Sequence, residues 1–279
     1  MAVRNQVARW RRQGQTVGLV PTMGALHAGH MALIYRSRRL CDRTVVSVFV
    51  NPTQFGPNED FAKYPRAWDA DRDLCEDAGV DLIFAPSVDV MYPDGFATTV
   101  QVGGIGRLWE GASRPGHFDG VATVVAKLFT IVGPDLAIFG QKDFQQTVVI
   151  NRMVEDLNLP VRVAVAPTVR EPGGLAMSSR NAYLDMPTRI DAQSIYRSLK
   201  WSEKQIRTGV RSVDRLRRGM TRLVEAGKRF KIDYIGFCDR ETLEPKKSAK
   251  APLVILIAAR CRVKGSAYNR RYIDNLVIR

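Results

Sequence analysis

Histidine and cysteine, two residue types that commonly hold metal ions, are scarce in this 279-residue sequence. It has three histidines and four cysteines, and no two cysteines have the Cys-x-x-Cys spacing that is typical of zinc sites. This argues against a cysteine-based metal centre. We expect the cysteines to be buried or free thiols in a reducing compartment, because disulfide frameworks belong mainly to small secreted chains.

Long hydrophobic runs and several well-known nucleotide-binding patterns are also missing. No apolar run approaches the roughly 20 residues that a membrane span requires. The basic N-terminal stretch lacks the apolar core and cleavage site of a secretory signal, so we expect a cytoplasmic protein without membrane association. There is no GxxxxGK[ST] loop, no GxGxxG after a strand and no GxSxG turn, which argues against the usual kinase, dehydrogenase and hydrolase classes.

Acidic residues are scarce only in the last third of the chain. Residues 1–186 contain 19 basic residues (Lys or Arg) and 19 acidic residues (Asp or Glu). Residues 187–279 contain 23 basic residues and 9 acidic residues. The whole formal charge of +14 therefore belongs to the last third. This asymmetry indicates two units with different roles. Composition alone leaves open whether the basic part faces RNA or closes over anionic small molecules.

Short apolar runs alternate with amphipathic patterns up to about residue 167. The runs at 16–22, 44–50, 80–86, 136–140 and 161–167 predict strands, and the segments 30–40, 69–79, 120–132 and 144–158 predict helices. This alternation predicts an α/β fold, with a parallel sheet covered by helices on both faces. A smaller α+β unit follows, with helices at 194–209 and 212–227 and strands at 231–239 and 251–260. We place the two domains at residues 1–168 and 169–279.

Four polar loops marked by Gly or Pro follow the predicted strands. They are PTMGALHAGH (21–30), NPTQFGPNED (51–60), GQKDFQQ (140–146) and TVREPGGLAMSSRN (168–181). The carboxyl ends of parallel strands meet at one edge of a sheet, and ligands of such sheets bind there. We therefore expect these loops to form one site.

Two of the three histidines, His27 and His30, lie in the first loop. Gly24 permits a tight turn, and Gly29 permits close approach by a ligand. If a helix begins near Ala28, its N–H groups attract phosphate, to which the imidazoles can donate hydrogen bonds. The alternatives are two structural histidines or a metal site. Zinc would need a third ligand, and none is nearby in the sequence.

The other loops offer a cation and several neutral polar groups. Lys142, next to Asp143 at the end of a predicted strand, is suited to hold a phosphate, although a solvent-exposed lysine is the alternative. Gln54, Gln145 and Gln146 can donate to or accept from hydroxyl and carboxylate groups, although glutamines are commonly exposed and inert.

The last loop combines two hydroxyls and a guanidinium. Ser178, Ser179 and Arg180 follow Gly173 and Gly174, which is a pattern suited to binding phosphate. The alternative is a helix N-cap with an arginine nearby.

Six motifs, in this order along the chain, resemble those of the pantoate–β-alanine ligase (pantothenate synthetase) family, within the nucleotidylyltransferase superfamily that carries a His-x-Gly-His loop. They are VPTMGALHAGH, VSVFVNPTQFGPNED, YPR, EGASRPGHF, FGQKDFQQ and REPGGLAMSSRN. The resemblance runs from about residue 17 to the end, where KIDY and YIDN are similar to the family's last part.

The resemblance implies a two-step, ATP-dependent ligation. Pantoate attacks the α-phosphate of ATP to give pantoyl adenylate and pyrophosphate, and the amine of β-alanine then displaces AMP to give pantothenate. It also implies a Rossmann-like N-terminal domain, a smaller C-terminal lid, a homodimer, and Mg²⁺ carried mainly by the phosphates. No covalent protein nucleophile is needed, in agreement with the absence of a nucleophile motif.

The resemblance also implies a role for each matching residue. The implied ATP site comprises Met23, Gly24, Ala25, Leu26, His27, Ala28, Gly29, His30, Gly140, Gln141, Lys142, Asp143, Val169, Met177, Ser178, Ser179 and Arg180. The implied catalytic residues are His30 as proton donor, His27, Lys142, Ser178 and Arg180. Gln54, Gln146 and Asn51 are implied to bind pantoate, with Gln54 also near β-alanine, and Asp71 to help hold the metal.

The sequence departs from the family pattern at two places in the predicted domain at 169–279. Gly173 stands where the family has Asp, and the basic segment 260–271 replaces a Trp-containing one. Two other hypotheses remain: a related nucleotidyltransferase that adenylates another acceptor, and a nucleic-acid-binding relative with reduced activity. The motifs around Gln54 and Gln146 argue against the first. We disfavour a nucleic-acid partner because no RNA-binding signature is present.

Overall fold

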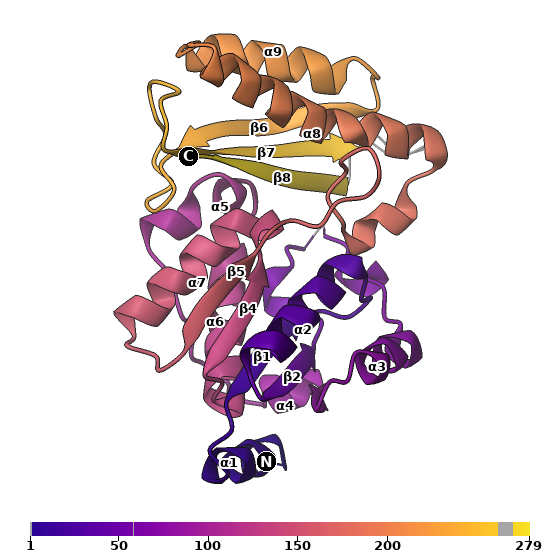
Figure 1. Cartoon of the computed structure of the whole chain (residues 1–279), viewed down its shortest axis with the longest axis vertical. Coiled ribbons are helices and arrows are strands. Elements are labelled where there is room, and N and C mark those ends of the chain that lie inside the picture. Colours follow the sequence, from indigo (N-terminus) through magenta and orange to yellow (C-terminus); the bar gives the residue numbers. More distant parts are fainter. Residues whose placement is uncertain (1, 58, 262–269) are drawn as a thin grey trace. The chain divides into compact units, whose positions relative to one another are not determined.

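Five parallel strands organise the N-terminal part of the chain in the computed structural model, which describes residues 2–57, 59–261 and 270–279 (Figure 1). The strands are β1 Val17–Thr22, β2 Arg43–Val48, β3 Leu82–Phe84, β4 Leu136–Gly140 and β5 Arg162–Ala166. Their order in the sheet is β3-β2-β1-β4-β5. The direction of winding reverses between β1 and β4, and open α/β sheets bind ligands at such a switch point.

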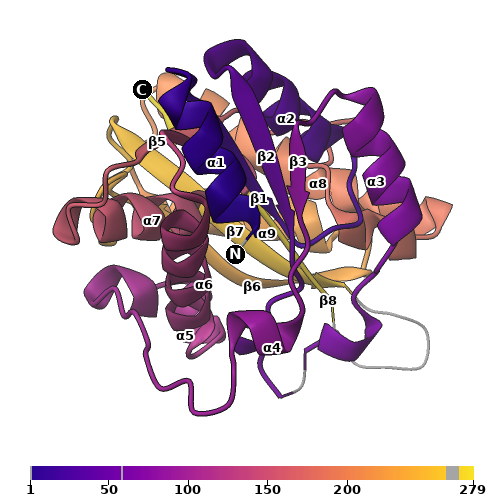
Figure 2. The same cartoon turned by 90° about the horizontal axis from the view of Figure 1, so that it is seen from below.

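Helices cover both faces of this sheet (Figure 2). The helices along this part of the chain are α1 Ala2–Arg12, α2 Ala28–Leu40, α3 Trp68–Asp77, α4 Val88–Met91, α5 Glu110–Ser113, α6 His117–Val132 and α7 Phe144–Asp156. Val17 and Leu19 of β1 pack in a core with residues of α1, α6 and α7, whereas Val20 packs in a second core with residues of α2 and α3. Burial on both faces explains why these strands are continuous apolar runs. The predicted fold class is confirmed.

The last third forms a three-stranded antiparallel sheet with two helices. The strands are β6 Phe230–Cys238, β7 Leu253–Cys261 and β8 Arg270–Ile278, in the order β6-β7-β8, and the helices are α8 Met186–Arg207 and α9 Val213–Glu225. Leu199, Leu216 and Phe237 are fully buried in their shared core.

Two local predictions for the last third differ from the structure. Helix α8 begins at Met186, earlier than the expected residue 194, because the Asp185 carboxylate caps it by accepting from the Thr188 N–H at 2.9 Å. Strand β8 was not predicted, because polar residues interrupt its apolar pattern. The departure at 260–271 falls largely on residues 262–269, which lie outside the described residues.

By their contacts, the described residues divide into two compact units. The first unit comprises residues 1–107, 111–141 and 149–167, and the second comprises 108–110, 142–148 and 168–279. Two short segments, 108–110 and the first turn of α7 with the residues before it, therefore belong with the last third. The functional domains at 1–168 and 169–279 stay a prediction.

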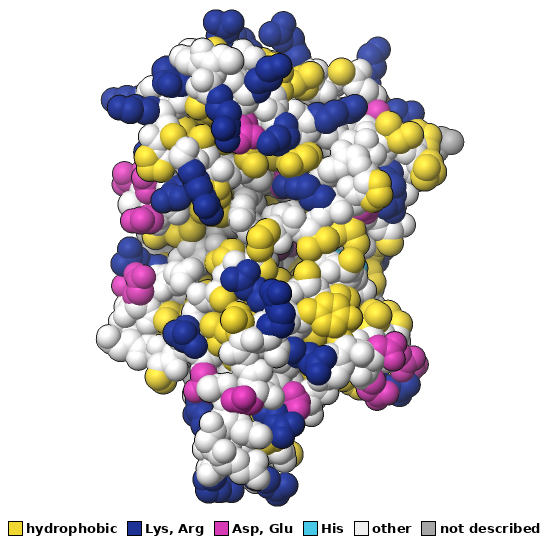
Figure 3. Space-filling model, viewed as in Figure 1, with side chains coloured by type: hydrophobic (Ala, Val, Ile, Leu, Met, Phe, Trp, Pro, Cys, Tyr) yellow, Lys and Arg dark blue, Asp and Glu magenta, His cyan; other side chains and the backbone are white. Residues whose placement is uncertain are grey.

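Positive charge gathers on helices α8 and α9 and on the residues just beyond their ends (Figure 3). The exposed cations here are Arg197, Lys200, Lys204, Arg207, Arg211, Arg215, Arg218, Arg222, Lys228 and Arg229. Cys75, Cys238 and Cys261 are buried thiols, as expected. Within the described part of the chain, no helix is both long and apolar enough to cross a membrane.

We predict that Gly120→Ala destabilises the first unit. Gly120 of α6 faces the short 3-10 helix η1, Pro52–Gln54, and a Cβ there would lie 2.4 Å from the Thr53 carbonyl oxygen. Overpacking against backbone should lower the free energy of unfolding by about 1–3 kcal/mol, as measured by urea denaturation. The matched control is Gly104→Ala, whose Cβ would meet nothing within 4 Å. Equal stability of the two variants would contradict the prediction.

Candidate active site

The turn that leaves β1 has an unusual backbone held by a buried carboxylate. Gly24 and Ala25 both have positive φ, +79° and +50°. The N–H groups of Ala25 and Leu26 donate to the two oxygens of Asp71, at 2.8 and 2.7 Å. Asp71 is 2% exposed and lies in the first turn of α3. The turn that leads to the histidines is therefore fixed from α3.

The two histidines lie together at the start of α2, as expected from the position of the helix. His27 is the N-cap, and its Nδ1 accepts from the Gly29 N–H at 3.1 Å. A neutral His27 ring consequently carries its proton on Nε2. The ring centroids of His27 and His30 are 4.1 Å apart. This helix start therefore offers N–H groups and imidazoles to an anion.

Asn51 organises the loop that follows β2. Asn51 is 1% exposed, and its Nδ2 donates to the Gln54 Oε1 at 3.1 Å and to the Gly120 carbonyl at 3.2 Å. Its Oδ1 accepts from the Tyr92 hydroxyl at 2.7 Å. Burial raises the pKa of Tyr92, so this hydroxyl keeps its proton and donates. Gln54 also reaches the loop after β1, where its Nε2 lies 3.3 Å from the Met23 Sδ.

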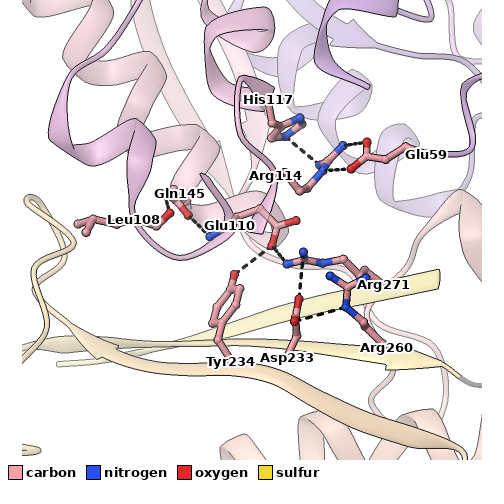
Figure 4. Close-up of polar contacts among 10 residues, drawn as sticks. All are labelled: Glu59, Leu108, Glu110, Arg114, His117, Gln145, Asp233, Tyr234, Arg260 and Arg271. Carbon is pink, nitrogen blue, oxygen red and sulfur yellow. Dashed lines mark hydrogen bonds and ion pairs between the residues drawn. The ribbon is translucent and has the colours of Figure 1, made fainter. Parts of the chain in front are cut away.

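The third histidine, His117, belongs to a polar network with Arg114 and Glu59 (Figure 4). Its Nδ1 lies 2.8 Å from the Gln54 carbonyl oxygen, and its Nε2 lies 3.0 Å from a guanidinium nitrogen of Arg114. A guanidinium only donates, so Nε2 accepts from it and Nδ1 carries the proton that is donated to Gln54. Arg114 also forms a bidentate pair with Glu59, at 2.6 and 2.5 Å.

In the second unit, strand β8 supports the predicted phosphate-binding lysine. The buried Asn275 donates from Nδ2 to the Lys142 carbonyl oxygen at 2.9 Å. The Lys142 Nζ lies 3.4 Å from the Asp143 Oδ1, and this ammonium is partly exposed. The neighbouring Gln145 is buried. Its side-chain amide accepts from the Glu110 N–H and donates to the Leu108 carbonyl, so both of its polar atoms bind the main chain of segment 108–110.

Strand β8 also anchors the loop that carries Ser178 and Arg180. Asp274 is 4% exposed and receives a bidentate pair from Arg170 at 2.6 and 3.0 Å. The Tyr272 hydroxyl donates to the Arg180 carbonyl at 3.0 Å. Ser178 caps the 3-10 helix η5, Ser179–Tyr183, with its Oγ accepting from the Arg180 N–H at 3.3 Å. The N-cap alternative for Ser178 is therefore present, and it leaves the hydroxyl free to donate as well.

A charged cluster fixes segment 108–110 within the second unit (Figure 4). Glu110 receives hydrogen bonds from Arg271 at 2.7 Å and from the Tyr234 hydroxyl at 3.1 Å. Burial, together with the Glu110 charge, raises the pKa of Tyr234 well above its usual value, so this hydroxyl remains a donor. Asp233 pairs with both Arg271 and Arg260, at 3.0 and 3.3 Å.

The predicted site residues thus fall into two groups. The first unit contains Met23, Gly24, Ala25, Leu26, His27, Ala28, Gly29, His30, Asn51, Gln54, Asp71, Gly140 and Gln141. The second unit contains Lys142, Asp143, Gln146, Val169, Met177, Ser178, Ser179 and Arg180. In the first unit, the contact between Met23 and Gln54 joins two of the loops. In the second unit, the Met177 N–H donates to the Val169 carbonyl at 2.9 Å, within the loop at 168–181.

Sequence reasoning missed the residues that hold these loops. Glu59, Arg114 and His117 fall in or next to recognised motifs. In the sequence, Arg114 lies 55 residues from Glu59 and 3 residues from His117, and neither spacing belongs to a periodic pattern that would predict the contact. Tyr272, Asp274 and Asn275 all lie in the recognised YIDN segment. The similarity of that segment to the family's last part was the one available signal.

The chain matches a known protein family and its solved structures over almost its whole length. Residues 1–277 match the family described as pantoate-beta-alanine ligase. The chain is 50% identical over 277 residues to the pantothenate synthetase of Moorella thermoacetica, covering 99% of this chain and 96% of the relative. It is 47% identical over 274 residues to that of Aquifex aeolicus, covering 98% and 95%.

Two crystal structures extend this likeness to the fold. The pantothenate synthetase of Thermus thermophilus has a TM-score of 0.90 at 49% identity, with 97% of each chain covered. The pantoate-beta-alanine ligase of Francisella tularensis, complexed with beta-gamma ATP and β-alanine, has a TM-score of 0.79 at 34% identity, with 98% of this chain and 95% of that chain covered.

We predict that Glu59→Gln lowers stability at neutral pH and that this loss disappears in acid. Burial favours the neutral acid, but the bonds and charge of Arg114 outweigh it and lower the pKa of Glu59. The stabilisation is therefore fully present above the unfolded value of about 4.3 and is lost as the pH falls through the lower folded-state pKa. Urea unfolding between pH 7 and 3 should show the difference from the parent protein shrink toward the acid end. The exposed Glu241→Gln is the control, and a difference that grows in acid would contradict the prediction.

Proposed function

This chain belongs to the pantoate–β-alanine ligase family, and we propose that its two groups of loop residues perform the reaction of that family. The chain is a ligase that condenses pantoate with β-alanine using ATP. The observation that carries this conclusion is the match to the family over residues 1–277. The anion-binding helix start at His27 and His30 supports it independently.

The first step that we propose is adenylation of pantoate. A carboxylate oxygen of pantoate forms a bond to the α-phosphorus of ATP, the bond from that phosphorus to the bridging oxygen breaks, and pyrophosphate leaves with the electron pair. The residues must bring two anions together and stabilise the charge on the leaving group. We assign the latter role to His27, His30, Lys142 and Arg180, with His30 as the proton donor and Ser178 as a hydroxyl donor.

The second step that we propose is transfer of the pantoyl group to β-alanine. The amine nitrogen attacks the carbonyl carbon of the adenylate, AMP leaves with the electron pair, and the nitrogen loses a proton. We assign Gln54 and Gln146 to pantoate, with Gln54 also near β-alanine. Direct contact of Asn51 with pantoate stays a prediction. Its two amide hydrogens already point to Gln54 and Gly120, which supports a role in orienting Gln54.

We propose that Mg²⁺ enters with the nucleotide. Mg²⁺ keeps several waters and usually binds through phosphates and one or two carboxylates. Among residues 2–57, 59–261 and 270–279, no three His, Cys, Asp or Glu side chains are grouped to hold a metal ion, which fits a cation that ATP carries. The metal-binding role of Asp71 stays a prediction, as do the homodimer and the cytoplasmic location.

A nucleic-acid partner for the basic face of α8 and α9 remains a disfavoured hypothesis. Several of its cations are engaged within the second unit, such as Arg207 with Glu203 at 3.0 Å and Arg229 with Asp191 at 2.7 Å. Binding to a phosphate backbone would weaken steeply as salt rises, so a salt titration with labelled RNA distinguishes it from the ligase function.

The direct test follows AMP and pyrophosphate release from ATP and Mg²⁺ with pantoate, with and without β-alanine. We expect sustained AMP release only with both substrates, and pantothenate as the product. Exchange of labelled pyrophosphate into ATP should require pantoate alone, because it reports the first step. Folded protein that catalyses exchange with another carboxylic acid but not with pantoate would favour the related nucleotidyltransferase.

We predict that His30→Ala and Lys142→Ala each lower the rate of pantoate-dependent exchange at least about a hundredfold, because each removes a group that stabilises the leaving pyrophosphate. Single-turnover formation of pantoyl adenylate measures the same step directly. The control is Lys231→Ala, which removes an exposed lysine outside the assigned site. Near-normal exchange in either site variant would remove that residue from the catalytic set.

A further inference from the structure

We propose that Asp71 is a positioning residue: its carboxylate holds the turn at Gly24 and Ala25 in a left-handed conformation and thereby sets the places of His27 and His30. This inference rests on the proposed function of the histidines. It assigns to Asp71 a role toward the protein main chain in place of the metal-binding role that the family resemblance implies.

The turn needs stabilisation by a residue from outside it, because two consecutive residues of its backbone have positive φ. A positive φ is accessible to Gly24 without strain, but the side chain of Ala25 makes the left-handed region unfavourable. Two consecutive residues in this conformation point the N–H groups of Ala25 and Leu26 in the same direction. The turn lies between β1 and α2, so these groups stand outside the hydrogen-bond ladders of the strand and the helix.

The Asp71 carboxylate matches this pair of donors. Its Oδ2 accepts from Ala25 at 2.8 Å and its Oδ1 accepts from Leu26 at 2.7 Å, so each oxygen binds one N–H. The approach depends on Gly24, because a Cβ at that position would lie 2.8 Å from Oδ2. The position of Asp71 in the first turn of α3 also favours a negative charge, since the N-terminal end of a helix is positive.

The contacts run directly from this turn to the histidines. Leu26 is followed by His27, which caps α2 through the Gly29 N–H, and His30 lies against His27 with ring centroids 4.1 Å apart. A change at Ala25 or Leu26 therefore moves the cap, and with it both imidazoles. Through these contacts, Asp71 acts on the histidines by way of the main chain.

The central experiment compares Asp71→Asn in two backgrounds, the parent chain and Ala25→Gly. The asparagine keeps one acceptor oxygen but places an NH₂ group against the other N–H, so it removes the paired acceptance with little change in volume. In the parent background we expect the kcat of pantoate-dependent exchange to fall at least about tenfold, with the KM for pantoate within about twofold. Glycine at position 25 adopts the left-handed conformation without help, so there we expect a loss several-fold smaller.

The scarcity of histidine supplies a readout that is independent of activity. With three imidazoles in the chain, ¹H–¹⁵N spectra of labelled protein resolve each one. We expect Asp71→Asn to shift the His27 and His30 signals and the Ala25→Gly background to reduce those shifts. The His117 signal should stay in place as the internal sign of a folded first unit. Asp73→Asn, an exposed aspartate in the same helix, is the matched control.

Three results would overturn the inference. They are unchanged exchange and histidine signals in Asp71→Asn, an equal loss in both backgrounds, and a raised Mg²⁺ requirement with histidine signals unmoved. The last result would assign Asp71 to the metal. A parent protein that makes no pantothenate would instead count against the proposed function, so the two failures are distinguishable.

Discussion

The irregular backbone just beyond the strands imposes the main constraint on this protein. Strands and helices pair their own N–H and C=O groups, but the loops that carry the predicted site do not, and a buried backbone group without a partner is costly. Buried polar side chains from elsewhere in the chain meet this need. Asp71 accepts from the turn after β1, and His117 donates to the main chain at Gln54. The site is therefore shaped by residues that need not touch a substrate.

The second unit meets the same constraint with one strand. Tyr272 and Asn275 of β8 donate to the carbonyls of Arg180 and Lys142, and Asp274 holds Arg170 at the start of the same loop. Because the side chains of a strand alternate between its faces, Tyr272 and Asp274 serve one loop from one face while Asn275 serves Lys142 from the other. A single short element thus supports both cations that we assign to the phosphates.

The sequence predicted what depends on local pattern. Apolar runs placed the five parallel strands, and the His-x-Gly-His loop was expected at the start of a helix, where His27 and His30 lie. Strand β8 was not predicted, because Asp274 and Asn275 interrupt its apolar pattern although both residues are buried. The partners of Asp71, Glu59 and Asn275 could not be found in this way. Each pairing joins residues dozens of positions apart, and only the folded chain brings them together.

The span of the β8 contacts bears on the order in which the protein acquires its structure. Asn275 and Lys142 are 133 residues apart, and Asp274 and Arg170 are 104 apart. Closing so long a stretch of chain lowers its conformational entropy before the contacts form and stabilise the fold. Proteins rich in such long-range contacts therefore fold slowly. The helices α8 and α9, by contrast, are neighbours along the chain. During refolding, the loops at Lys142 and Arg180 should thus gain protection from hydrogen exchange later than this helical pair.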